Sequence, residues 1–194
     1  MSASADGNTT RVNNATYYVW GAQCEIGNGA TTYIPTTSTT ASRNSENLNY
    51  PATGNIDAAT GTVYAEHTLL VSTIPSSGRI IGYLGVSSAS PMTLGSSNLF
   101  QSADGTNFPA VAVAMLVNTT YKLVNAFGGV TQTLARGNPS AGSSLDAAYD
   151  GAMGATLTSI NIGNIGTNQP QGCVRNVKIY KVKVNNTVAQ SLVA

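Results

Sequence analysis

The sequence predicts an all-β protein, a jelly-roll sandwich of two antiparallel sheets. Helix signals are nearly absent, because Thr, Val, Asn, Gly and Ser recur so often that no window keeps apolar residues at helical spacing. Segments rich in β-branched and aromatic residues are instead separated by Gly, Asn and Pro turn signals, with no helical crossover between them. A chain of 194 residues is long enough for one large sandwich.

The N-terminal part, residues 1–60, is expected to form a strand and an extended connector. Residues 15–26 are β-branched and aromatic, and they end at the turn cluster Gly27-Asn28-Gly29. Residues 31–60 are rich in Thr and Ser and contain two prolines, which lack the N–H that a sheet ladder needs. We expect this connector to lie over the surface of the sandwich, formed by residues 61–194, as one structural unit with it.

Residues 62–74 carry the clearest strand pattern, an alternation typical of a sheet with one buried side. Because side chains alternate along a strand, one set of residues shares the buried face. That set is Val63, Ala65, His67, Leu69 and Val71. Tyr64, Glu66 and Thr68 fall on the opposite face. His67, the sole histidine, is therefore interpreted as a core residue with one hydrogen-bond partner.

The later elements follow from the same signals. Residues 110–117 are apolar on both faces, which is typical of a central strand, and a turn leads from them into 121–127 as a hairpin. In residues 173–184 the apolar positions change parity, which predicts a bulge near Arg175-Asn176. Further strands are expected at 79–86, around 98–101, at 130–135 and at 156–163, long loops at 87–109 and 136–155, and one helical turn within 185–194.

Composition argues against several classes of partner. Only 9% of residues are charged and the net charge is +1, so no field gathers phosphates and nucleic acid is not expected. The basic cluster Arg175, Lys178, Lys181 and Lys183 is interpreted as the solvated face and ends of a late strand. No secretion signal begins the chain and no run approaches the roughly 20 apolar residues of a membrane helix, so no membrane partner is expected.

The two cysteines, Cys24 and Cys173, lie far apart in sequence and in apolar surroundings. No CxxC motif or partnering histidine accompanies them, so no zinc site is predicted. Buried free thiols are the default expectation, and a disulfide between the two stays open as an alternative.

Two stretches resemble known protein families. The first resembles a signature of bacteriophage tail and fiber proteins, and the second resembles the opening, middle and closing strands of a concanavalin A-like, laminin-G-like module. The first comprises Trp20-Gly21-Ala22-Gln23, Glu25, Gly27 and Thr32-Tyr33-Ile34-Pro35-Thr36, with Arg43 and Glu46 after it. The second comprises residues 61–66, 121–123 and 172–180. Together they cover most of the chain, with departures at Cys24, where an aliphatic residue is more usual, and at His67, where an aromatic is.

The resemblance implies a non-catalytic phage virion structural module, in a fiber or capsid, that binds glycan or a host cell surface. It also implies contacts with other virion proteins, a homo-oligomer with a trimer favoured, and a location in the virion after assembly in host cytoplasm. If the first signature closes a preceding module, residues 1–26 either add an edge strand or pair with a neighbouring chain. The alternatives are a purely structural decoration or assembly domain with no ligand, and a glycan-cleaving enzyme.

Catalysis is not expected from the residues themselves. The eight acids are isolated, and no Glu-x-Asp-x-x-Glu stretch supplies the carboxylate pair that glycoside hydrolysis needs. His67 shares its strand face with Ala65 and Leu69, which argues against a Ser-His-Asp arrangement.

Candidate ligand-binding residues lie in the two long loops, where aromatic rings and amide or carboxylate groups occur together as a sugar site requires. The first loop offers Asn98, Asp104, Asn107 and Phe108, and the second offers Asp146, Tyr149 and Asp150. The same carboxylates suit calcium, the one cofactor considered. The plainer interpretation is that these are Asx-turn residues and small hydrophobic anchors. Trp20, near Tyr17 and Tyr18, is expected to serve core packing or a subunit contact more than sugar stacking.

Overall fold

The computed structural model describes residues 16, 18–24, 32–42, 48–70, 78–84, 90–94, 98–112, 114–138, 141–149, 151, 153, 158–163 and 172–194. The chain forms two compact units, Met1–Arg43 and Asn44–Ala194. The expected connector, residues 31–60, is divided between these two units.

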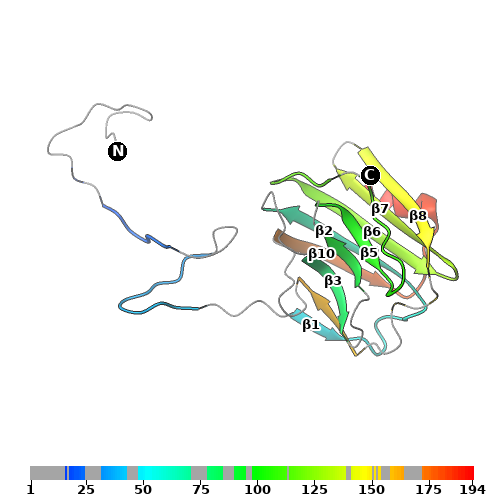
Figure 1. The fold of residues 1–194 in the computed structure, drawn as a ribbon, viewed down its shortest axis with the longest axis horizontal. Helices are drawn as coiled ribbons and strands as arrows, with labels where there is room; N and C mark the ends of the chain where they lie inside the picture. Colours follow the sequence, from blue (N-terminus) through cyan, green and yellow to red (C-terminus); the bar gives the residue numbers. More distant parts are fainter. Residues whose placement is uncertain are drawn as a thin grey trace. The chain divides into compact units, whose positions relative to one another are not determined.

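The second unit is a sandwich of two antiparallel five-stranded sheets, which confirms the predicted fold class (Figure 1). We call sheet A the order β1-β9-β3-β4-β5, and sheet B the order β10-β2-β6-β7-β8. Sheet A contains β1 (Leu48–Pro51), β9 (Ser159–Ile162), β3 (Gly78–Leu84), β4 (Ser90–Leu94) and β5 (Phe100–Ala103). Sheet B contains β10 (Gly172–Tyr180), β2 (Thr60–Leu69), β6 (Thr120–Gly128), β7 (Thr131–Asn138) and β8 (Ala141–Ala148).

The alternation read along β2 is borne out by burial. Val63, Ala65 and Leu69 are fully buried in the core cluster that also contains Ile81 of β3 and Phe127 of β6. His67 is buried as well, as expected for a core histidine. Burial of apolar surface at about 25 cal/mol per Å² is the main term that holds the two sheets together.

Helix α1 (Asn186–Val193) packs on the outer face of sheet B, mainly over β6 and β7 (Figure 1). The tail therefore forms a longer helix than the single turn expected. Asn185 caps it, because its side chain accepts a hydrogen bond of 2.9 Å from the Val188 amide. Gly137 allows the close contact: a Cβ there would lie 1.6 Å from the Val193 carbonyl oxygen.

Three expected loops or strands differ from prediction. In residues 110–112 and 114–117 the only ladder contact is the bridge Gln101↔Ala110, so the expected central strand is not formed. Val111 and Met115 still enter the core, because their amides bond to the carbonyls of Phe100 and Asn98 rather than to a strand. The expected loop 87–109 also contains β4, while β5 overlaps the short strand expected around 98–101. The expected loop 136–155 contains β8, which pairs with β7 along its whole length.

The predicted bulge in β10 is present. The register with β2 shifts between Arg175 and Lys178, and Asn176 has a positive φ of 52°. Both cysteines are free and exposed, so the expectation of buried thiols is wrong.

The first unit is described only in part. Residues 18–24 are extended without strand pairing, and Gln23 Oε1 accepts a hydrogen bond of 2.8 Å from the Ile34 amide. Trp20 is 85% exposed and its ring lies 5.2 Å from that of Tyr33, so Trp20 does not serve core packing.

Candidate functional site

The first loop predicted to bind ligand is held together by Asp104. This residue is buried, and its carboxylate accepts hydrogen bonds from the Thr106 amide (2.9 Å), the Asn107 amide (2.6 Å) and Asn107 Nδ2 (3.0 Å). Asp104 thus forms an Asx turn, the plainer of the two interpretations. Phe108 stands 61% exposed beside it, and the Asn98 carbonyl accepts from the Met115 amide at 2.8 Å.

The second group of predicted residues is split between two faces of sheet B. Tyr149 is buried and donates to the Ala58 carbonyl at 2.7 Å, so it anchors the core rather than a ligand. Asp146 lies on β8 and accepts from Thr133 Oγ1 (2.8 Å) and from Asn186 of α1, so it fastens the helix. Asp150 lies outside the described residues.

Gln132 brings the two predicted groups together. Its Nε2 donates to Asp104 Oδ2 at 3.4 Å and to the Ala148 carbonyl at 3.0 Å. The Asp104 loop and the segment leading to Tyr149 therefore meet at one end of the sandwich, with their polar groups used to hold each other.

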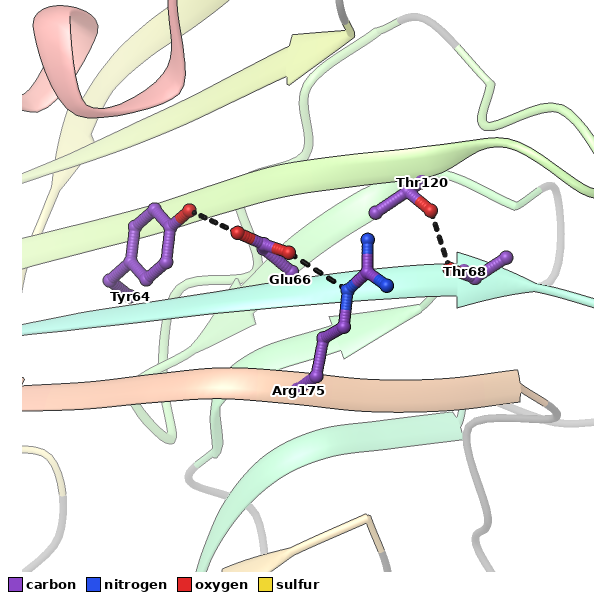
Figure 2. Close-up of polar contacts among 5 residues, drawn as sticks. All are labelled: Tyr64, Glu66, Thr68, Thr120 and Arg175. Atoms are coloured by element: carbon purple, nitrogen blue, oxygen red, sulfur yellow. Dashed lines mark hydrogen bonds and ion pairs between the residues drawn. The ribbon is translucent and has the colours of Figure 1, made fainter.

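A second polar cluster lies on the outer face of sheet B, and none of the ligand-binding residues predicted from the sequence belongs to it (Figure 2). We call this cluster the sheet B patch. It contains Tyr64, Glu66 and Thr68 of β2, Thr120 of β6 and Arg175 of β10. The polar face predicted for β2 supplies three of these residues, and the register places Arg175 opposite Glu66 and Thr120 opposite Thr68.

Glu66 is the centre of the sheet B patch. Arg175 Nε donates to Glu66 Oε2 at 2.9 Å, and the Tyr64 hydroxyl donates to Oε1 at 3.0 Å (Figure 2). A hydrogen bond from Asn176 lowers the pKa of Glu66 below its ordinary value, against the effect of burial, and the bonds from Tyr64 and Arg175 lower it further. Glu66 is therefore ionised at neutral pH and holds the guanidinium in place.

Tyr64 is a hydrogen-bond donor in this arrangement. Burial raises the pKa of its phenol to about 12, and the hydrogen bond to Glu66 adds to the effect. The phenol keeps its proton at neutral pH. Lys178 Nζ lies 5.2 Å from the centre of the Tyr64 ring, in a cation–π contact that covers one side of the ring.

The bulge in β10 decides which charges reach this face. In a regular strand residues three apart point to opposite sides, yet Arg175 pairs with Glu66 and Lys178 pairs with Tyr64, which share a face. The extra residue in the bulge therefore adds a second cation to the patch. The parity change that predicted the bulge was the sequence signal for this site.

The two threonines form a bonded pair beside the guanidinium. Thr68 Oγ1 and Thr120 Oγ1 lie 2.7 Å apart, and either can be the donor. One of the two hydroxyl hydrogens forms the hydrogen bond between the threonines, so the hydroxyl that accepts this bond can donate its own hydrogen to a ligand.

No group of three or more His, Cys, Asp and Glu side chains occurs within the described part of the chain. Among the described residues, no helix is long and apolar enough to cross a membrane.

Comparison with known proteins gives structural matches alone. No family matches the chain, and no curated protein matches it either. Among solved structures, a mutant Trypanosoma rangeli sialidase displaying trans-sialidase activity is similar at 15% identity and a TM-score of 0.49, over 69% of this chain and 23% of that one. The Trypanosoma rangeli sialidase in complex with sialic acid is similar at 15% identity and a TM-score of 0.47, over 66% and 22%. The native heptameric SAP-like pentraxin from Limulus polyphemus is similar at 10% identity and a TM-score of 0.46, over 71% and 70%.

These matches correct the expectation that the chain is not an enzyme, because the similar structures include sialidases. This chain spans less than a quarter of the sialidase chains. At these identities the likeness concerns the fold alone, and it assigns neither a catalytic residue nor a substrate to this chain.

Proposed function

We propose that this chain is a structural module of a bacteriophage virion, in a tail fiber or capsid, that binds glycan or a host cell surface through the sheet B patch. The observation that carries the binding role is the fixed geometry of Arg175. Its guanidinium is held by Glu66, which Tyr64 also fixes, while the side chain stays 60% exposed. A donor already fixed in place loses little conformational entropy when it binds a ligand.

The phage assignment rests on the sequence signature around Trp20 and Tyr33. Residues of that signature make local contacts in the first unit, between the Trp20 and Tyr33 rings and between Gln23 and Ile34. In this proposal the first unit joins the module to other virion proteins, and the second unit faces the ligand.

A glycan array probed with the purified chain, with and without calcium, tests the binding role. We expect binding to at least one bacterial surface polysaccharide. The same polysaccharides are assayed for released reducing ends, because sialidases are among the structural matches. Light scattering measures the oligomer, for which we propose a trimer.

The second candidate function is assembly without a ligand, and one observation favours it. Tyr18, Val19 and Trp20 are 96%, 75% and 85% exposed, an apolar run of the kind that subunit contacts cover. A stable oligomer together with silence across the whole array would support this second function over the first.

A further inference from the structure

We infer that the sheet B patch binds the carboxylate of an acidic glycan, with Arg175 as its anchor. This inference rests on the proposed glycan-binding function and deepens it by naming the class of ligand. Three features support it: the free N–H groups of Arg175, the charge of the patch and the side chains around the guanidinium.

Arg175 has hydrogen-bond donors that its contact with Glu66 does not use. Its guanidinium carries five N–H groups, and the Nε–H is used by Glu66. The terminal nitrogens Nη1 and Nη2 make no hydrogen bond to the described residues, and the side chain is 60% exposed. The planar fork of a guanidinium matches a carboxylate in two parallel hydrogen bonds, which a lysine cannot supply.

The charge of the patch favours an anion. On the outer face of β2, β6 and β10, Arg175, Lys178 and Lys122 contribute three positive charges and Glu66 is the one acid, whereas Asp146 lies on β8 and bonds to α1. Lys122 Nζ already donates a hydrogen bond to the main-chain oxygen of Ala194, and Lys178 Nζ lies over the Tyr64 ring. Both lysines are thus drawn toward partners of their own, whereas Arg175 presents its unused donors in the planar fork that fits a carboxylate, and Lys178 adds attraction at longer range.

The surroundings of Arg175 suit a sugar more than a protein surface. Figure 2 shows the guanidinium between Glu66 and the Thr68–Thr120 pair, which offers one free hydroxyl donor and several lone pairs to the hydroxyls of a sugar ring. No large exposed apolar side chain lies on β2 or β6, and the one on β10, Tyr180, pairs with Thr62 at the opposite end of the strand pair from Arg175, whereas protein interfaces have apolar centres. The patch thus matches a ligand that is hydroxylated and carries a carboxylate.

The test measures binding of the full chain to hyaluronate and polysialic acid, to their carboxyl-reduced forms, to dextran sulfate and to single-stranded DNA. We expect at least one carboxylated polymer to bind tenfold or more tightly than its carboxyl-reduced form. Arg175→Gln should weaken that binding at least tenfold, and Arg175→Lys should recover only a minor part. Lys181→Gln is the matched control, because it removes an exposed cation that lies beyond the end of β10.

A second measurement locates the ligand without mutation. Cys173 is exposed and pairs with Thr68, so it lies on the same face as Arg175, whereas the exposed Cys24 lies in the first unit. Alkylation of Cys173 should slow at least threefold in the presence of the bound polymer, while alkylation of Cys24 keeps its rate. Circular dichroism and urea unfolding of each variant verify that it is folded.

The outcomes separate the inference from the proposed function. Binding of neutral glycans that Arg175→Gln leaves unchanged would overturn the inference and keep the function. Equal losses in Arg175→Gln and Lys181→Gln, or tighter binding to dextran sulfate or DNA, would also overturn it in favour of unspecific attraction. No binding to any of these polymers or to any glycan of the array would overturn both the inference and the proposed function.

Discussion

The Tyr64 hydroxyl and the Glu66 carboxylate, two residues apart on β2, meet on the outer face of sheet B at 3.0 Å. Alternation along the strand places both side chains on one side, and Arg175 from β10 binds the second oxygen of Glu66. Glu66 therefore links the buried phenol of Tyr64 to the exposed guanidinium of Arg175. The titrations of the Glu66 carboxyl and of the Tyr64 phenol each report on this contact.

Glu66→Gln should change how stability depends on acid pH. Since the pKa of Glu66 is lowered in the folded protein, its ionised form stabilises the fold above the ordinary pKa, near 4.5, and that stabilisation is lost as pH falls through the folded value. In urea unfolding, the advantage of the wild type over Glu66→Gln, about 1 kcal/mol at neutral pH, should shrink as the pH falls below 4.5. Parallel stability curves for the two proteins would contradict this account.

Tyr64→Phe should remove a phenol that titrates at about pH 12. The ultraviolet absorbance of phenolate measures this directly in the folded protein. Because the folded chain keeps a proton that the unfolded chain releases near pH 10, the free energy of unfolding should fall between pH 10 and 12 in the wild type and less in Tyr64→Phe. The control Tyr50→Phe, on the edge strand β1, should leave the component at pH 12 in place.

Gly137→Ala should displace α1. The added Cβ would meet the Val193 carbonyl oxygen at 1.6 Å, so the last turn of the helix must move and uncover Val124 and Ala135. We expect a loss of roughly 2–4 kcal/mol in the free energy of unfolding, as for an overpacked core site. Gly129→Ala is the matched control: its Cβ meets open space and its φ is +66°, so the cost should stay near 1 kcal/mol.

Asp104→Asn tests whether the predicted loop is a scaffold. The amide keeps one acceptor oxygen but replaces the other, so the bonds from Asn107 Nδ2 and Gln132 Nε2 to Oδ2 lose their acceptor. We expect a loss of about 2 kcal/mol in urea unfolding. Phe108→Ala, a change at an exposed ring, should stay within about 0.5 kcal/mol. Loss of glycan binding in folded Phe108→Ala would return the binding site to this loop.

A fragment of residues 44–194 should fold without the first unit. Both sheets, both apolar clusters and α1 lie within it. We expect cooperative urea unfolding with a midpoint close to that of the full chain. If the first unit carries the subunit contact, light scattering should report a smaller oligomer for the fragment, and an unchanged oligomer would place that contact on the sandwich.

The sequence alone determined the features that depend on neighbouring residues. The alternation along β2, the strands at 121–127 and 130–135 and the bulge near Arg175 were all predicted, because side-chain parity and turn residues are local properties of a chain. The two-sheet class followed from the same signals.

Tertiary structure decided the rest, because strand partners are chosen between segments far apart in the chain. β8 consists mostly of small residues with weak strand preference, and it is a strand because β7 offers it a ladder along its whole length. Residues 110–117 have the stronger apolar pattern, yet the amides of Val111 and Met115 bond to the carbonyls of Phe100 and Asn98 instead of to a strand. Glu66 and Arg175 are 109 positions apart, so the contact at the centre of the sheet B patch exists only once β2 and β10 are paired.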